Sequence, residues 1–292
     1  LRLSCVPRKR IVMKVETITD QLFFVTVRIA AVAADGNVGI GTAFIVEHSW
    51  SEGRKGCFLV SNRHVFEGAD SIRFAFLKSD GDAPLLGRIQ EIEIHHSRGW
   101  VTNHPHQDVD LAAIPLGPVL NQLAQTGERV FYRAIPTSLI ATSPQLEELS
   151  PIEEVVFVGY PNNVHDSVNH LPVARRGTTA TPPSVDFCGR PCFLLDGSVF
   201  PGSSGSPVFV ANEGAFVTRA GMNIGANRIL LLGVIASVVV REVNGELDFV
   251  TVPTRIKPVV TTEECVDLGL VFKGHLIIET IEAILRVCGE SV

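Results

Sequence analysis

The chain contains few aromatic and few charged residues. Of its 292 residues, 7% are aromatic and 19% charged, whereas 46% are hydrophobic. The formal net charge is -6, so there is no basic excess to neutralise phosphates, and we expect no nucleic-acid partner. The longest apolar segment, Ile229–Val240, is much shorter than the roughly 20 residues that a membrane-spanning helix needs. We therefore expect a buried strand there and no membrane partner.

Cysteine is also scarce, with 6 residues in the whole chain. None shares a metal-ligand spacing with nearby histidines, so we expect neither a metal nor a cofactor. Cys188 and Cys192 could close a small loop, but their spacing matches no zinc or redox motif. The segment LRLSCVPRKR has its basic cluster after a very short apolar stretch, the reverse of a secretory signal. These features predict reduced thiols and a cytoplasmic protein.

What the sequence does contain is a series of short β-rich runs separated by turn residues. Gln21–Ala34 is followed by the turn signal Asp35-Gly36-Asn37 and by a second strand at Gly39–Glu47. Asn244-Gly245 is the strongest hairpin signal and predicts a turn between Val238–Val243 and Glu246–Val252. The other predicted strands are Cys57–Ser61, Ile72–Leu77, Arg88–Ile94, Asp110–Leu116, Val155–Gly159, Phe193–Asp196, Pro207–Val210 and Ile229–Val240.

Helical periodicity is weak until His275–Val287, where apolar residues recur at helix-face spacing. The loop Thr137–Pro151 is rich in Ser, Pro and Glu and is the best candidate for a connection between two halves. The pattern therefore predicts an all-β chain of two barrels or sandwiches, with one C-terminal helix.

Three segments carry residues with catalytic chemistry. Ser204 lies between glycines in residues 202–207 (GSSGSP), where a tight turn would expose its hydroxyl; by itself this is also ordinary loop composition. His64 follows the apolar strand at 57–61, and histidine is the usual general base, although a lone histidine more often only bonds a strand end. Asp110 opens another apolar strand, where a carboxylate can be a turn residue or can orient an imidazole.

Their order along the chain, His then Asp then Ser, is that of the chymotrypsin-like triad. Four segments together resemble the motifs of trypsin/chymotrypsin-like serine peptidases. Within that family the sequence looks closest to the bacterial branch with HtrA-type and glutamyl-endopeptidase-like enzymes, without a PDZ domain. The segments are 41–44 (GTAF), 61–65 (SNRHV), 110–112 (DLA) and 202–207 (GSSGSP), and 158–161 (VGYP) also fits the branch.

The resemblance implies roles for individual residues. Ser204 would be the nucleophile, His64 the general base and then acid, and Asp110 the group that fixes the imidazole tautomer. The N–H groups of Gly202 and Ser204 would form the oxyanion hole. Asp108 is a fallback for the acid. His104 and His106 are expected to be solvated, with a metal site there as a distant second interpretation.

The resemblance also implies a fold of two six-stranded antiparallel β-barrels. Residues 14–140 would form the N-terminal barrel with His and Asp, 150–260 the C-terminal barrel with Ser, and 261–292 an extension with a helix. Ser203 stands where secreted trypsins have an acid that pairs with a freshly cut N-terminus. We therefore expect no activation by N-terminal insertion.

The same resemblance assigns a substrate pocket with Ser198 as its floor and Ala236, Ser237 and Val238 as one wall. None of these is charged, so we expect small or medium uncharged residues at the cleaved position. The main hypothesis is a serine endopeptidase that acts on a protein or peptide substrate. The alternatives are a catalytically silent relative that binds peptides or serves in assembly, and, more weakly, an esterase or acyltransferase.

Overall fold

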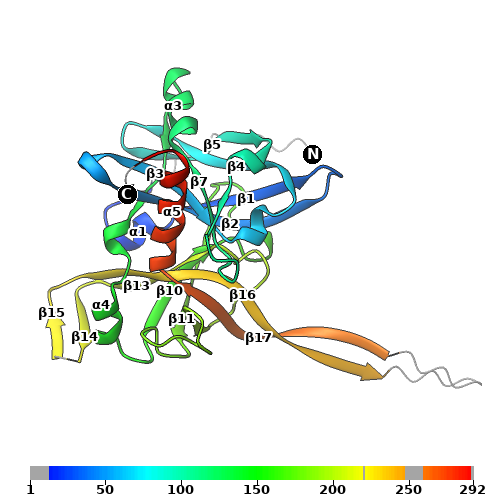
Figure 1. Ribbon diagram of the computed structural model, residues 1–292. Helices are drawn as coiled ribbons and strands as arrows, with labels where there is room; N and C mark the ends of the chain where they lie inside the picture. Colours follow the sequence, from blue (N-terminus) through cyan, green and yellow to red (C-terminus); the bar gives the residue numbers. More distant parts are fainter. Residues whose placement is uncertain (1–12, 220, 247–258, 291–292) are drawn as a thin grey trace, which may run out of the picture.

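The computed structural model describes residues 13–219, 221–246 and 259–290, without side chains at 52 and 238–266. The described chain is nearly all β. Its first half forms a nine-stranded sheet, and its second half contains a closed six-strand barrel in the order β10-β11-β12-β17-β16-β13. In Figure 1 the two halves lie one above the other, and the C-terminal helix α5 (red) extends from the level of the upper half to that of the lower one. The predicted all-β fold with a C-terminal helix is confirmed.

The first half contains nine strands in the sheet order β5-β4-β1-β2-β3-β7-β6, with β8 on β4 and β9 on β2. Its elements are α1 (Ile18–Leu22), β1 (Thr26–Ala33), β2 (Val38–Ser49), β3 (Lys55–Ser61), α2 (Arg63–Phe66), β4 (Ala69–Asp80), β5 (Ala83–His95), β6 (Thr102–Asn103), β7 (Ala112–Pro115), α3 (Gly117–Gln125), β8 (Val130–Phe131) and β9 (Ile135–Pro136).

The second half follows the short helix α4 (Ser143–Glu148). Besides the barrel, the strands β14 and β15 pair as a small separate sheet. The elements are β10 (Glu154–Gly159), β11 (Val173–Thr179), β12 (Cys192–Asp196), β13 (Pro207–Asn212), β14 (Ala215–Thr218), β15 (Gly221–Ile224), β16 (Arg228–Glu246), β17 (Val259–Lys273) and α5 (His275–Val287). None of the helices among the described residues is long and apolar enough to cross a membrane.

Strand β2 shows how one strand can serve two hydrophobic cores. Side chains alternate between the faces of a strand, so its buried run splits into two sets. Ala43 and Ile45 belong to the core of the first half. Phe44 and Val46 belong to a second cluster that also contains residues of the barrel and of α5. An uninterrupted apolar run in this strand therefore reflects burial on both faces.

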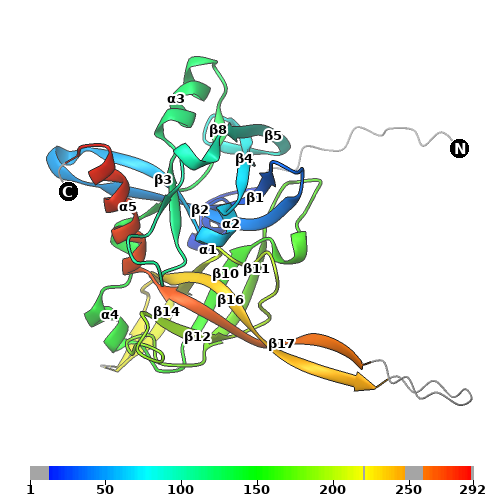
Figure 2. The ribbon, with the colours of Figure 1, turned by 45° about the vertical axis from the view of Figure 1, so that its right-hand side comes forward.

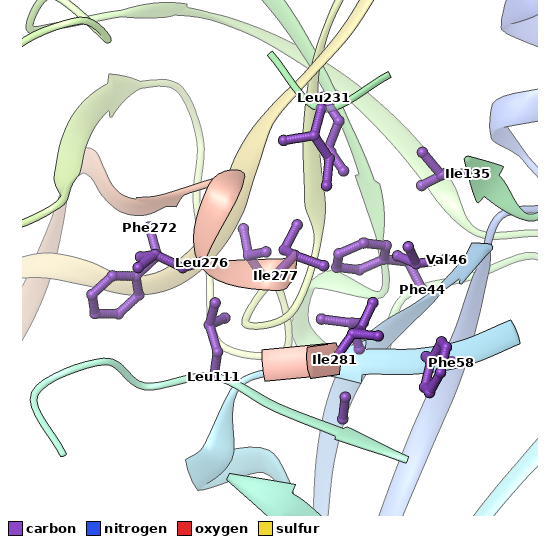
Figure 3. Close-up of a cluster of buried hydrophobic side chains, with 14 of the residues drawn as sticks. Phe44, Val46, Phe58, Leu111, Ile135, Leu231, Phe272, Leu276, Ile277 and Ile281 are labelled. Atoms are coloured by element: carbon purple, nitrogen blue, oxygen red, sulfur yellow. The ribbon is translucent and has the colours of Figure 1, made fainter. Parts of the chain in front are cut away.

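Helix α5 closes the junction between the halves. Its predicted limits, His275–Val287, agree with the structure, and the predicted apolar face is buried. Figure 3 shows Leu276, Ile277 and Ile281 packed among side chains from both halves, including Phe44 and Leu231. Each fully buried side chain of this size contributes about 1.5 to 3 kcal/mol. The helix thus fixes the two halves relative to each other.

The predicted turn at Asn244-Gly245 is wrong. In the structure β16 continues to Glu246, and its antiparallel register places Asn244 opposite Thr261 and Gly245 opposite Val260. The long ladder with β17 overrides the local preference of Asn-Gly for a tight turn. The segment 247–252 of the predicted second strand lies outside the described residues.

The predicted C-terminal extension also differs from the structure, because residues 259–273 form the barrel strand β17. This strand pairs with both β12 and β16, with Val271 opposite Phe193 and opposite Ile235. In Figure 2 it runs along the barrel before the chain turns into α5. The sequence concealed the strand because Glu263, Glu264 and Asp267 interrupt its apolar pattern. Only the pairing with distant strands identifies it.

Candidate active site

His64 and Asp110 are brought together by the pairing of two strands. His64 lies in α2 directly after β3, and Asp110 lies just before β7. These strands are antiparallel neighbours, with Ser61 opposite Ala112, so the residues that follow β3 meet those that precede β7. The Asn62 side chain donates to the Asp110 carbonyl oxygen at 2.8 Å and secures this junction.

The Asp110 carboxylate holds His64 by two bonds. Asp110 Oδ2 lies 2.5 Å from His64 Nδ1, and Asp110 Oδ1 accepts the backbone N–H of His64 at 3.0 Å. With Nδ1 engaged by the carboxylate, Nε2 is the ring nitrogen left to exchange a proton. This is the arrangement that orients an imidazole as a general base.

The neighbouring candidates take other positions. Asp108 is exposed, and the imidazole of His64 bonds to Asp110 instead. His106 is exposed as expected, but His104 is buried, which corrects the expectation that both are solvated. His104 Nε2 lies 3.3 Å from Glu279 of α5, and burial lowers the pKa of this histidine. The apolar helix that covers His104 could not be placed from the local sequence.

Ser204 lies on a turn that requires two glycines. Gly202 and Gly205 have φ of +85° and +84°, a backbone conformation that favours glycine. A Cβ on Gly205 would also lie 1.8 Å from the carbonyl oxygen of Thr42. The two glycines of GSSGSP are therefore required by this turn, which presents the partly buried Ser204 just before β13.

Thr42 of β2 anchors that turn from the other half of the molecule. Its N–H donates to the Ser204 carbonyl at 2.9 Å, and its hydroxyl donates to the Gly202 carbonyl at 2.9 Å. The same hydroxyl accepts the N–H of Tyr160 at 3.1 Å. Sequence reasoning identified the GTAF segment as a motif but did not find this role for Thr42. The contact spans 160 residues of chain, so no local signal reveals it.

The site residues line one pocket of about 320 Å³. Its walls include His64, Asp110 and Ser204, and the remainder is supplied by residues 199–201 and 235–237. The Ser204 hydroxyl donates to the carbonyl oxygen of Ala236 at 3.2 Å. Among the described residues it makes no hydrogen bond to His64. The three side chains therefore share a cavity, with the hydroxyl turned toward the barrel.

Two backbone donors beside Ser204 have no acceptor in the described part of the chain. They are the N–H groups of Gly202 and Ser204, whereas the intervening N–H of Ser203 donates to the Phe200 carbonyl at 2.9 Å. Paired free N–H groups next to a nucleophile can stabilise negative charge that develops on a substrate oxygen. These are the two donors that the sequence analysis assigned to an oxyanion hole.

The predicted pocket residues are only partly brought together. Ala236 and Ser237 line the pocket, the first buried and the second exposed. Ser198 is exposed and lies outside the lining, where Val199, Phe200 and Pro201 take its place. The side chain of Val238 lies outside the described residues. The apolar lining was missed because the turn before Ser204 has no regular periodicity.

The chain was also compared with known proteins. The Trypsin-like peptidase domain family matches residues 41–218, which is more than half of the chain and includes His64, Asp110 and Ser204. No curated protein matches the chain.

Three solved structures are similar over most of the chain. They are an inactive mutant of Rv3671c from M. tuberculosis H37Rv (14% identity, TM-score 0.44, covering 92% of this chain and 90% of that chain), a mutant of the tobacco etch virus protease (12%, 0.41, 72% and 66%) and the scabies mite inactivated protease paralogue S-I1 (13%, 0.46, 90% and 95%). On the evidence of the family match, this chain belongs to the trypsin-like peptidase domain family.

Proposed function

We propose that this protein is a serine endopeptidase that cleaves protein or peptide substrates through an acyl-enzyme. The observation that carries the proposal is the pocket that Ser204 shares with an imidazole held by Asp110. We place the enzyme closest to the HtrA-type and glutamyl-endopeptidase-like branch of the family. Residues 14–140 and 150–260 are proposed as its two halves, with β17 added to the second.

The proposed reaction begins when the Ser204 hydroxyl turns from Ala236 toward Nε2 of His64. Nε2 accepts the hydroxyl proton while Oγ attacks the carbonyl carbon of the scissile bond. The N–H groups of Gly202 and Ser204 bind the oxygen that gains negative charge. His64 then gives the proton to the leaving amine, and the C–N bond breaks. Water, activated by the same nitrogen, hydrolyses the ester and restores Ser204.

The pocket lining favours an uncharged residue at the cleaved position. Apart from His64 and Asp110, every residue that lines the pocket is neutral, and most are apolar. A buried Lys or Arg side chain would lose hydration without gaining a counter-charge there. We therefore propose Ala, Val, Ile or Leu as the preferred residues, above Phe and Trp. In a profiled peptide library, dominant cleavage after Arg, Lys or Glu would contradict this preference.

The experiment that tests the enzyme is covalent labelling with a fluorophosphonate probe, followed by intact-mass measurement. The wild-type protein should gain one adduct, located at Ser204 by peptide mapping. Ser204→Ala should remain unlabelled, and Ser184→Ala, a change at an exposed serine, should label like the wild type. Folded wild-type protein with unchanged mass would rule out the proposed activity.

A second function has one observation in its favour. Among the described residues the Ser204 hydroxyl bonds to Ala236 and makes no bond to His64, and a catalytically silent relative that only binds peptides needs no bond between Ser204 and His64. Peptide binding and peptide cleavage can be told apart by the fate of a library peptide. A peptide-binding module would bind a library peptide with the same affinity before and after probe treatment, whereas the enzyme would cleave it.

A further inference from the structure

Arg175 of β11 reaches beneath the turn that carries Ser204. One end of its guanidinium, Nη2, donates to Ser203 Oγ at 2.6 Å, and the other, Nη1, donates to the carbonyl oxygen of Ser198. The hydroxyl of Ser203 also accepts the N–H of Phe200 at 3.3 Å. A single side chain therefore holds both ends of the segment 198–203, immediately before Ser204.

The surroundings of this guanidinium make it rigid. Its central carbon lies 4.6 Å from the ring centre of Phe157 and 5.9 Å from that of Phe200. Stacking between two rings limits the rotation of the planar group and adds cation–π attraction. Burial lowers the pKa of Arg175 to about 10, so the group still carries its charge at neutral pH.

The charge of Arg175 has no carboxylate partner among the described residues, whose ion pairs all involve other side chains. A half-buried unpaired cation costs stability unless its donors are well used. Here each of the two Nη groups donates one hydrogen bond, to Ser198 and to Ser203. Hydrogen bonds from a charged donor are shorter and stronger than neutral ones, and the forked guanidinium fixes both acceptors in one geometry.

We propose that Arg175 is a positioning residue for the proposed reaction, which holds the segment 198–203 so that the Gly202 and Ser204 N–H groups face the substrate oxygen. The inference rests on the proposed function. Ser203 is fully buried and directly precedes Ser204, so a shift of Ser203 also moves the backbone donors on both sides of it. A misplacement of about 1 Å in such a site can cost about a hundredfold in rate.

A direct contact between Arg175 and substrate fits the structure less well. Arg175 is not among the residues that line the pocket beside Ser204, whereas Phe200, which stacks on it, is. Both Nη groups are already engaged by the protein, and Nε is buried without a partner in the part of the chain that the structure describes. The guanidinium therefore influences the pocket indirectly, through the segment 198–203 that it holds.

The test is the rate constant of fluorophosphonate labelling in Arg175→Met, with Arg176→Met as the matched control. Arg176 is the next residue of the same strand, with an exposed side chain on the opposite face. We expect Arg175→Met to label about 10- to 100-fold more slowly than wild type, and Arg176→Met to label at the wild-type rate. Arg175→Lys should fall between them, because an ammonium lacks the fork that serves two acceptors.

A second measurement separates positioning from binding. In the Ser204→Ala background, Arg175→Met should change the Kd of an Ala-containing library peptide and of its Glu counterpart by the same factor, because residues 199–201 of the held segment line the pocket for both. Selective loss of affinity for the Glu peptide would make Arg175 a substrate contact and overturn the inference.

The remaining outcomes are equally decisive. If wild type labels and Arg175→Met labels as fast as Arg176→Met, the inference is wrong and the proposed function stands; if wild type does not label, the proposed function itself fails. Should Arg175→Met fail to fold, Ser203→Ala tests the same bond from its acceptor side. Slower labelling of folded Ser203→Ala supports the inference, and an unchanged rate overturns it.

Discussion

The two halves of the molecule hold their site residues in different ways. His64 and Asp110 lie at the ends of neighbouring strands, and their mutual bonds stay within the first half. Ser204 lies on a turn that bonds to both halves. From the first half, Thr42 donates hydrogen bonds to two carbonyl oxygens of the turn. From the second half, the carbonyl oxygen of Ile235 accepts the N–H of Gly205 at 2.8 Å.

This difference teaches that the two sides of the site depend on different interactions. The orientation of His64 depends on one carboxylate, that of Asp110, so a single substitution of Asp110 should disturb it. The Ser204 side depends on backbone geometry and on contacts between the halves, because two residues of its turn have positive φ. Changes far from Ser204 in sequence, in β2 above all, are therefore expected to alter the position of Ser204.

The largest expected effect comes from removing the central residue of each side. Ser204→Ala and His64→Ala should each lower kcat by about 10⁶, because the two act as one unit in the proposed reaction. The double variant should lose little more than either single one. Steady-state kinetics on a cleaved library peptide measure all three. Losses that multiply would show that the two sides work independently.

A smaller loss is expected from the partner of His64. Asp110→Asn keeps the shape of the side chain but presents an amide to Nδ1, which disfavours the required tautomer and should lower kcat by about 10⁴. Asp108→Asn changes an exposed carboxylate two residues earlier and should leave kcat near its wild-type value. Equal losses in the two variants would mean that the imidazole is not oriented by Asp110. The measurement is kcat at saturating peptide.

The smallest effect is expected at the contact between the halves. Thr42→Val removes a hydroxyl that makes two hydrogen bonds, one to the turn of Ser204, and should lower the free energy of unfolding by about 1 to 3 kcal/mol. Thr26→Val is the matched control, because the buried Thr26 hydroxyl has no hydrogen-bond partner among the described residues. Urea unfolding gives both values.

The comparison of Thr42→Val with Thr26→Val can also contradict the proposed dependence of the Ser204 turn on β2. Thr26→Val should be neutral or stabilising, because it replaces an unpaired buried hydroxyl by a methyl group. Kinetics should show a loss of kcat/KM in Thr42→Val alone. If the two variants behave alike, the Ser204 turn does not depend on β2.

Local patterns were sufficient to predict much of the fold. The limits of α5 follow from its apolar spacing, and β3 and β10 follow from short apolar runs bounded by polar residues. The hairpin of β1 and β2 follows from its Asp-Gly-Asn turn, in which Gly36 has φ of +86°. All of these depend on residues that are close in the chain, where periodicity and turn chemistry apply.

What could not be predicted depends on residues that are distant in the chain. β17 is recognised only by its pairing with β12 and β16, and the reach of Arg175 to Ser203 depends on how β11 lies under the turn. The direction of the Ser204 hydroxyl is set by the carbonyl of Ala236, 32 residues away. The order of the motifs along the chain predicted that the site residues lie close together, but it contains no information about the rotamer of Ser204.

The late position of β17 has a consequence for how the protein is made. A ribosome delivers β10 to β16 before β17, so β12 and β16 have no common neighbour until residues 259–273 have been synthesised. At roughly 5 to 20 residues per second, the nascent barrel remains open for some time after Ser204 has emerged. Open strand edges are sites of mispairing during that interval. A chain assembled in this order completes the half that carries Ser204 last, after nearly the whole described chain exists.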